Sequence, residues 1–167
     1  CNGAAGNEPI RPGTSEAELL AEAVAAVSLS LARQMAVDAE GATKVIEVRV
    51  AGAASEDDAQ LAARSIASST LLKCAVHGND PNWGRILMAL GNAPVALDEN
   101  RLCAAINNVR MVQAGAPLPF DAASASKAMD APLVVIEVDM GLGNGQGVAL
   151  GCDLSEEYVT LNADYTT

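Results

Sequence analysis

Three stretches of the sequence carry the side chains best suited to chemistry. The stretch His77 to Ile86, HGNDPNWGRI, holds the only histidine and the only tryptophan of the chain. The stretch Asp38 to Lys44, DAEGATK, holds two carboxylates, and the chain ends in NADYTT. An imidazole can act as a general base near neutral pH, and a carboxylate can bind a substrate ammonium through charge-assisted hydrogen bonds. Each stretch is therefore a candidate site.

The HGNDPNWGRI stretch allows two interpretations. His77 could be a general base, and Arg85 could bind a carboxylate through two N–H groups. The alternative is a rigid hydrogen-bonded turn with Trp83 as its apolar anchor, in which the following helix is capped by one of three polar residues, Asn79, Asp80 or Asn82. We favour the turn, and we assign no role in catalysis to His77 or Arg85.

The carboxylates of DAEGATK lie just beyond the expected end of a long helix. The helix dipole is negative there, so an anion within the last turn is destabilising by about 0.3–1 kcal/mol. Placing both Asp38 and Glu40 at this point is reasonable if one of them binds a cation, such as a substrate ammonium. The alternative is that both side chains extend into water beyond the reach of the dipole, and these residues alone leave that alternative open.

The tail YVTLNADYTT is expected to be strand-like and packed against the protein, because most chain ends are frayed and polar whereas this one is rich in large side chains. Those side chains are Tyr158, Val159, Leu161 and Tyr165. Two neutral residues, Asn162 and Thr167, would then be available as hydrogen-bond donors and acceptors.

The glycine-rich stretch GLGNGQG, residues 141 to 147, is not expected to bind a dinucleotide. Its glycines fall at 141, 143, 145 and 147, whereas the G-x-G-x-x-G fingerprint needs a glycine at position 146 and a helix directly after the loop. The stretch instead joins two expected strands, PLVVIEVDM and GVALGCDL, and Asn144-Gly145 is a typical turn between paired strands. We therefore expect a hairpin.

Hydrophobic periodicity predicts the elements that position these residues. Ser15 and Glu18 form a capping box for an amphipathic helix that runs to about Val37. Alternation in KVIEVRV predicts a half-buried strand, and a second helix starts at Ser55 and ends near Ser69. We further expect strands at LLKCAV, RLCAAI and VRMVQ, and helices at WGRILMAL and DAASASKAM. This mixture of helices and antiparallel hairpins predicts one layered α+β domain across residues 1–167.

Composition restricts the function classes. Half of the 167 residues are hydrophobic but only 2% are aromatic, so we expect a core of Ala, Val, Leu and Ile. The net charge of −11 disfavours nucleic acids and anionic membranes, and no stretch approaches the ~20 apolar residues of a membrane span. The four cysteines have no C-x-x-C spacing, so we expect no metal site and infer buried, reduced thiols in a cytoplasmic protein. Spacing alone leaves a disulfide open.

The motifs NGAAGN, EGATKVIEVRV, LLKCAVHGNDPNWGRI and GCDLSEEYVTLNADYTT resemble, in order and along nearly the whole chain, the β-chain of ornithine acetyltransferase, also called glutamate N-acetyltransferase. Members of that family are made as one precursor that cuts itself into α- and β-chains. The resemblance implies acetyl transfer from N2-acetylornithine to glutamate in arginine biosynthesis, with acetyl-CoA as a second donor in some members and no other cofactor. It also implies a layered α/β sandwich, an α-chain partner and a cytoplasmic α2β2 heterotetramer.

The resemblance assigns three residues of this chain to substrate binding. Glu40 matches the family's substrate-binding glutamate, and Asn162 and Thr167 match its C-terminal substrate contacts. The family nucleophile is the β-chain's N-terminal Thr, which we expect upstream of Cys1. Cys1 itself aligns inside the family chain, so we assign no catalytic residue to this chain, and we expect a processed subunit or a fragment.

Two alternatives to the acetyltransferase stay open. The first is a related self-processing amidohydrolase or aminopeptidase, which hands its acyl group to water. The second is a non-catalytic assembly or amino-acid-binding module, which the absence of the nucleophile from this chain favours.

Overall fold

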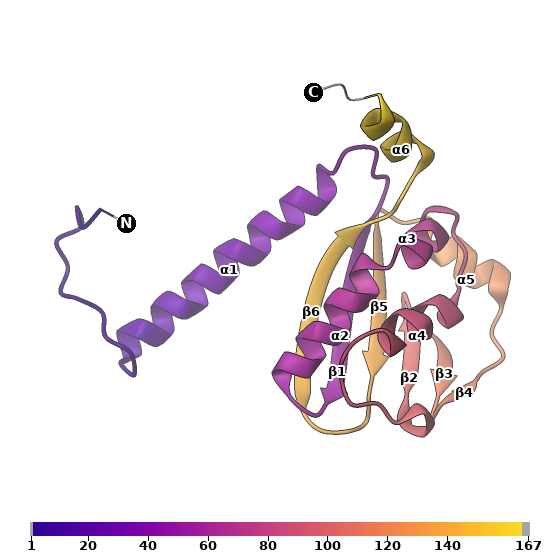
Figure 1. Cartoon of the computed structure of the whole chain (residues 1–167), viewed down its shortest axis with the longest axis horizontal. Helices are drawn as coiled ribbons and strands as arrows, with labels where there is room; N and C mark the ends of the chain where they lie inside the picture. Colours follow the sequence, from indigo (N-terminus) through magenta and orange to yellow (C-terminus); the bar gives the residue numbers. More distant parts are fainter. Residues whose placement is uncertain (1, 165–167) are drawn as a thin grey trace. The chain divides into compact units, whose positions relative to one another are not determined.

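The computed structural model describes residues 2–164, and Figure 1 traces their path. Close approaches between Cα atoms divide the chain into two compact units, residues 1–35 and residues 36–167. We describe each unit by itself. The expectation of a single domain across residues 1–167 stays a prediction.

The first unit consists of an N-terminal loop and most of helix α1 (Ser15–Val37). This helix confirms the predicted helix and its end at Val37. The capping box expected at Ser15 and Glu18 is wrong, because Thr14 Oγ1 accepts the backbone N–H of Ala17 at 3.3 Å and so caps the helix one residue earlier. Ser15 is consequently the first helical residue.

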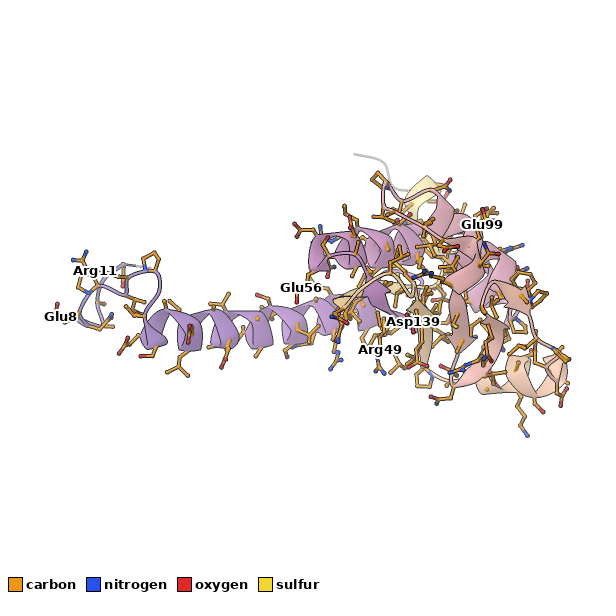
Figure 2. The ribbon with its side chains drawn as sticks, turned by 90° about the horizontal axis from the view of Figure 1, so that it is seen from below. Glu8, Arg11, Arg49, Glu56, Glu99 and Asp139 are labelled. Atoms are coloured by element: carbon orange, nitrogen blue, oxygen red, sulfur yellow. The ribbon has the colours of Figure 1, made fainter. Side chains whose placement is uncertain are left out.

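Helix α1 has no buried residue, and its side chains project on both sides of the helix in Figure 2. The five residues of its expected apolar stripe, Leu20, Val24, Val27, Leu31 and Met35, are 49–75% exposed. By length and composition alone, with a mean hydropathy of 1.3, α1 could cross a membrane. The expectation that no stretch approaches a membrane span was therefore too strict. Core helices of soluble proteins share this composition, so α1 by itself assigns no membrane.

The second unit contains a six-stranded mixed sheet with the strand order β4-β3-β2-β5-β1-β6. Its strands are β1 (Val45–Ala53), β2 (Cys103–Ile106), β3 (Val109–Gln113), β4 (Ala116–Pro117), β5 (Leu133–Asp139) and β6 (Gly145–Cys152). Its helices are α2 (Glu56–Ser68), α3 (Thr70–His77), α4 (Trp83–Gly91), the short 3-10 helix η1 (Glu99–Arg101), α5 (Ala122–Ala128) and α6 (Glu156–Ala163). The predicted α+β layered class with a mixed sheet is confirmed.

Strand β1 lies between β5, to which it is parallel, and β6, to which it is antiparallel. Val48 stands opposite Ile136 on one side and Ala149 on the other. The expected hairpin between β5 and β6 is therefore wrong, because β1 separates these two strands. The true antiparallel hairpin joins β2 to β3, and its two turn residues, Asn107 and Asn108, have positive φ angles of 45° and 65°, as type I′ turns require.

The core forms where helices pack on one face of the sheet. The alternation predicted for β1 is confirmed, since Ile46, Val48 and Val50 are at most 2% exposed. Helix α2 packs on β6 and β1, and α4 reaches β2, as Figure 1 shows. The core consists of the expected Ala, Val, Leu and Ile, and three methionines complete it, Met111, Met129 and Met140.

The strand expected at LLKCAV is wrong, because these residues belong to helix α3. Ser69 begins the helix by accepting the backbone N–H of Leu72 on its side chain. The buried residues Leu72, Ala75 and Val76 then follow the three- and four-residue spacing of a helix face. A short apolar run of this kind fits a strand and a buried helix equally well.

The cysteines differ from the sequence expectation as well. The described thiols are free, but Cys74 is exposed, and Cys103 and Cys152 are only partly buried. The expectation of buried thiols is therefore wrong for these three positions. Cys1 lies outside the described residues.

The glycines of β6 allow α2 to lie directly against the strand. A Cβ atom placed on Gly147 would lie 2.5 Å from the Ala59 carbonyl carbon and 2.6 Å from the Gln60 nitrogen. Both atoms belong to the backbone of α2, so no flexible side chain could move aside. The glycine-rich stretch therefore serves helix-on-strand packing.

We predict that Gly147→Ala lowers the free energy of unfolding by about 1–3 kcal/mol, the usual cost of overpacking a tight core. Gly91→Ala is the matched control, because nothing lies within 4 Å of a Cβ at Gly91 in helix α4. Alanine is favoured over glycine in helices, so this control should keep or raise stability. Urea unfolding followed by circular dichroism measures both variants. Equal stability of the two variants would contradict the packing argument.

Candidate functional site

A buried carboxylate, Asp153, lies at the point where the polar segments of the second unit converge. Asp153 follows β6 and is 2% exposed. Its Oδ1 accepts the backbone N–H groups of Thr43 and Lys44 at 2.8 and 2.9 Å. Its Oδ2 accepts the Thr43 hydroxyl at 2.6 Å and lies 2.7 Å from His77 Nδ1. A charge buried to this degree is stable only when it is paired and hydrogen-bonded.

The environment of Asp153 keeps its carboxyl group ionised. Burial raises the pKa, but hydrogen bonds from Thr43, His77 and the backbone of Lys44 lower it by more, so the pKa lies below its ordinary value of 3.8. Hydrogen bonding to the charged form has this effect in general. At neutral pH the cluster is therefore built around a fixed negative charge.

The turn that carries Glu40 is held next to this charge. Ala42 donates its backbone N–H to Ala39 at 3.0 Å, and Gly41 has a φ of +67°. A positive φ at the third turn position is typical of a type II turn and favours glycine. Glu40 occupies the corner of the turn, and its side chain is exposed.

Helix α6 begins directly against the same turn. The Ser155 hydroxyl donates to the Gly41 carbonyl and accepts the backbone N–H of Tyr158, which caps α6. A Cβ on Gly41 would lie 2.4 Å from the Tyr158 nitrogen. Glycine is therefore required at position 41 both for the turn and for the close approach to α6.

The HGNDPNWGRI segment is the third segment that contacts the Asp153 cluster, after the Glu40 turn and the start of α6. Asn82 caps α4 by accepting the backbone N–H of Arg85 at 3.1 Å, and Trp83 packs against the core. Lys44 Nζ donates to the side-chain oxygen of Asn79 and, at 3.1 Å, to the Val76 carbonyl. The rigid-turn interpretation is confirmed.

Arg85, which we considered as a carboxylate ligand, binds a backbone oxygen instead. Its Nη1 donates to the Leu71 carbonyl at 2.6 Å. The guanidinium thus joins α4 to α3 and serves packing.

The structure brings the segments of two expected substrate residues together, without a direct contact between their side chains. Gly41 places the Glu40 turn against Tyr158, and Asn162 lies one turn further along α6. The Asn162 amide donates to the Tyr158 carbonyl of its own helix at 2.9 Å. Within residues 2–164, no hydrogen bond joins Glu40 to Asn162. Thr167, the third expected residue, lies outside the described residues.

The described part of the tail is helical through Ala163, so the expectation of a packed, strand-like end is wrong for these residues, and Tyr165 lies outside the described residues. Ser155 starts α6, and Glu156 and Glu157 occupy its first turn, where the helix dipole favours anions. Tyr158, Val159 and Leu161 are 42–58% exposed. These large side chains remain available at the surface beside the Glu40 turn.

Sequence reasoning missed two residues that organise the site, Asp153 and Ser155. The capping signal of Ser155, a serine followed by two glutamates, was available but was outweighed by the apolar tail. Nothing local in GCDL indicates that Asp153 is buried, since its partners Thr43 and His77 are 110 and 76 residues away.

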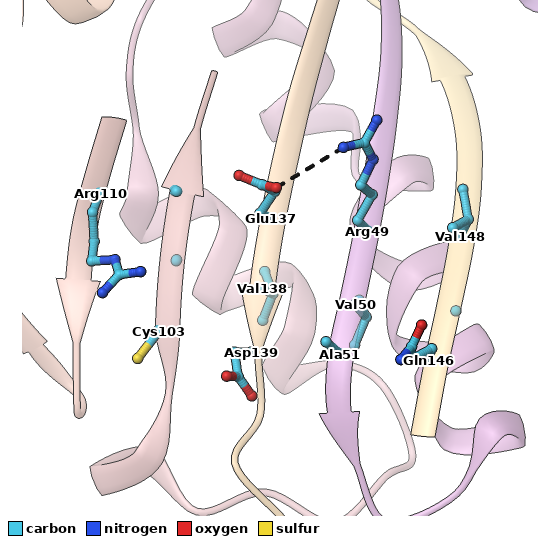
Figure 3. A pocket seen from close by; sticks show the side chains of 13 residues that line it. Arg49, Val50, Ala51, Cys103, Arg110, Glu137, Val138, Asp139, Gln146 and Val148 are labelled. Carbon is cyan, nitrogen blue, oxygen red and sulfur yellow. Dashed lines mark ion pairs between the residues drawn. The ribbon is translucent and has the colours of Figure 1, made fainter. Parts of the chain in front are cut away.

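Apart from the Asp153 cluster, a hollow of about 450 Å³ lies over the sheet, and Figure 3 shows its charged lining. Arg49 Nη2 lies 2.7 Å from Glu47, and its Nη1 lies 4.0 Å from Glu137. Arg110 and Asp139 add one further charge of each sign. These opposite charges largely balance, so the hollow has no clear preference for a charged ligand. Within the described part of the chain, no three His, Cys, Asp or Glu side chains gather where they could hold a metal ion.

Fold and site together define a layered α+β protein that presents a glutamate-bearing turn above a buried carboxylate. Comparison with known proteins agrees with this architecture. The chain is similar to a crystal structure of the arginine biosynthesis bifunctional protein ArgJ from Bacillus halodurans, with a TM-score of 0.89 and 38% sequence identity over 98% of this chain and 77% of that one.

The chain belongs to the ArgJ family, whose profile matches residues 1–167. It is 49% identical to the arginine biosynthesis bifunctional protein ArgJ of Deinococcus radiodurans and 45% identical to that of Symbiobacterium thermophilum, in each case over 99% of this chain. It spans 41% of the length of either relative. The family resemblance inferred from the motifs is confirmed.

We predict that Asp153→Asn lowers the free energy of unfolding at neutral pH by about 1–3 kcal/mol. The Asn side-chain oxygen can still accept the two backbone N–H groups, but an NH2 group in place of Oδ2 cannot accept from the Thr43 hydroxyl and His77 Nδ1. Since the folded-state pKa of Asp153 is lowered, its stabilisation is present above the ordinary value of 3.8 and is lost as pH falls through the lowered pKa. The stability gap between wild type and variant should therefore narrow below pH 3.8. Urea unfolding across a pH series measures it, and a gap independent of pH would contradict the role of the charge.

Proposed function

We propose that this chain forms the substrate-binding part of a glutamate N-acetyltransferase, which moves an acetyl group from N2-acetyl-L-ornithine to L-glutamate in arginine biosynthesis. Membership of the ArgJ family supports the pathway and the class of enzyme. The observation that carries the proposal to this site is the joining of the Glu40 turn to α6 through Gly41 and Ser155. That contact brings two residues with matching family roles, Glu40 and Asn162, to one end of the unit.

In this proposal Glu40 binds the ammonium group of the substrate. N2-acetylornithine carries a free side-chain ammonium, and glutamate carries an α-ammonium. An exposed carboxylate at a turn corner is accessible to either one. Asn162 and Thr167 supply neutral hydrogen bonds from the C-terminal segment.

The chemistry that we propose is ping-pong acyl transfer through an N-terminal Thr that this chain does not contain. The Thr hydroxyl, activated by its own α-amine, attacks the acetyl carbonyl. The acetyl ester forms, the amide C–N bond breaks, and ornithine leaves with its amine protonated. The α-ammonium of glutamate then gives one proton to water, and the free α-amine attacks the ester. A second proton of that amine passes through the Thr α-amine to the Thr oxygen, which leaves as a hydroxyl. Hydrogen-bond donors to each oxyanion would be worth about 3–4 kcal/mol.

We further propose that the partner is an α-chain from the same precursor, in a cytoplasmic α2β2 heterotetramer. The chain spans 41% of its relatives' length, which leaves room in such a protein for a second chain. The proposed reaction needs no cofactor, because its nucleophile and its hydrogen-bond donors are protein groups. Acetyl-CoA would enter as an alternative acetyl donor.

Replacing Glu40 by Gln should raise KM for N2-acetylornithine by about 10- to 100-fold, because a hydrogen bond to a charged group contributes about 1.5–3 kcal/mol and each 1.4 kcal/mol is tenfold. Steady-state kinetics of the full-length enzyme measure this change. Asp38→Asn is the matched control, since it removes the same charge two residues earlier and should leave KM unchanged. Equal effects of the two substitutions would argue against a specific ammonium site at Glu40.

Ornithine release distinguishes a transferase from a hydrolase. With N2-acetylornithine as donor, release should depend on glutamate and should yield N-acetylglutamate in equal amount, because the acetyl-enzyme waits for the second amino acid. Measuring both products by mass spectrometry, with and without glutamate, tests this. Release that is indifferent to glutamate would support the amidohydrolase or aminopeptidase alternative, and no release from a correctly assembled enzyme would support the non-catalytic binding module.

A further inference from the structure

We propose that His77 is a positioning residue, whose ring connects the buried Asp153 to the first residue of α6 and so fixes the Glu40 turn relative to Asn162. This inference rests on the proposed function for the meaning of Glu40 and Asn162. Its geometry stands on contacts within the second unit alone.

Both ring nitrogens of His77 face carboxylates. Nδ1 lies 2.7 Å from Asp153 Oδ2, and Nε2 lies 3.2 Å from Glu156 Oε2. An ionised carboxylate only accepts hydrogen bonds, whereas a neutral imidazole has one donor and one acceptor nitrogen. The doubly protonated ring is therefore the one form that donates to both partners at once.

The two contacts differ in strength because their surroundings differ. The Asp153 side chain is fully buried, the His77 side chain is 28% exposed, and the Glu156 side chain is 93% exposed. Water screens the contact to Glu156, so that contact is weak by itself. The pKa of Glu156 lies below its ordinary value, first through a hydrogen bond with its own backbone and second through the charge of His77.

Two carboxylates contact the ring directly. Asp153 approaches from the end of β6 and Glu156 from the start of α6. The nearby Lys44 ammonium is directed to the Val76 carbonyl and to Asn79. Asn79 in turn donates to Asp130 at 3.4 Å. The ring therefore lies between the end of β6 and the start of α6 and links them through its two nitrogens.

The same groups determine where the substrate residues lie. Asp153 holds Thr43 and Lys44, which end the segment that carries Glu40. Glu156 lies next to Ser155, whose hydroxyl binds Gly41. Without the His77 ring, the start of α6 loses its link to Asp153 and keeps the contact of Ser155 with Gly41. We infer that KM for both amino acids rises when the ring is removed, whereas the acyl-transfer step itself is affected less.

Nitrogen NMR of the full-length enzyme labelled with ¹⁵N-histidine tests the two ring contacts directly. His77 is the only histidine of this chain, and its signals are identified by their loss in His77→Gln. We expect Asp153→Asn to shift the Nδ1 signal and Glu156→Ala to shift the Nε2 signal, because each nitrogen contacts one of these carboxylates. Ring signals that neither substitution moves would overturn the proposal without any assay of activity.

Kinetics of the same enzyme test the consequence. His77→Gln should raise KM for N2-acetylornithine and for glutamate by about tenfold, the scale of one charge-assisted hydrogen bond, with a smaller change in kcat. Glu156→Ala should act in the same direction but more weakly. Glu157→Ala, which removes the neighbouring exposed carboxylate, should leave KM unchanged.

The outcomes separate this inference from the proposed function. If Glu40→Gln raises KM and His77→Gln leaves KM as in the wild type, the positioning role is overturned and the acetyltransferase stands. If the wild-type enzyme transfers no acetyl group, the proposed function fails, and the NMR signals still decide whether the ring contacts both carboxylates.

Discussion

One buried negative charge organises this end of the molecule. The Asp153 carboxylate is inaccessible to water, and it is compensated by donors from two distant segments, Thr43 with Lys44 and His77. An uncompensated charge in that position would cost several kcal/mol, so the carboxylate requires these partners and holds them in return. The turn that presents Glu40 is therefore attached to the end of the sheet through hydrogen bonds to a buried charge.

Close backbone approach supplies the second constraint. Gly41 lets the turn touch the start of α6, and Gly147 lets α2 lie on β6. In both places the neighbouring atoms are backbone, so even one methyl group would force an element to move. The Ser155 hydroxyl completes the first contact by binding the turn and capping the helix at once. The arrangement thus depends on a few small residues as much as on the charged ones.

The sequence predicted the parts of the structure that are determined locally. Periodicity and capping residues predicted α1, α2, α5 and the alternation of β1, and residue motifs predicted the family. Sheet order was not predictable in this way, because β1 pairs with β5 and β6 across 80 or more residues of chain and the Asn144-Gly145 turn suggested a direct hairpin. The short run at LLKCAV and the apolar tail are each compatible with a strand or a helix. Burial of one helix face makes the first a helix, and the cap at Ser155 begins a helix in the second.

The candidate site shows the same division. Glu40 and Asn162 were identified through family motifs, and the turn character of HGNDPNWGRI followed from its Asn, Asp and Pro content. The importance of Asp153 could not be predicted from the sequence. A buried carboxylate is recognised only by its partners, and those partners lie far away in sequence. Electrostatic sites of this kind emerge from topology, since folding alone brings the donors to the acceptor.

The central claim is that Asp153 holds the Glu40 turn to the sheet, and hydrogen exchange of the backbone amides of Thr43 and Lys44 tests it most directly. Both amides donate to Asp153, so in the folded enzyme they should exchange as slowly as the interior amides of β1 and should become fast when Asp153 is replaced by Ala. Exchange at the rate of an open loop in the wild-type protein would contradict the account.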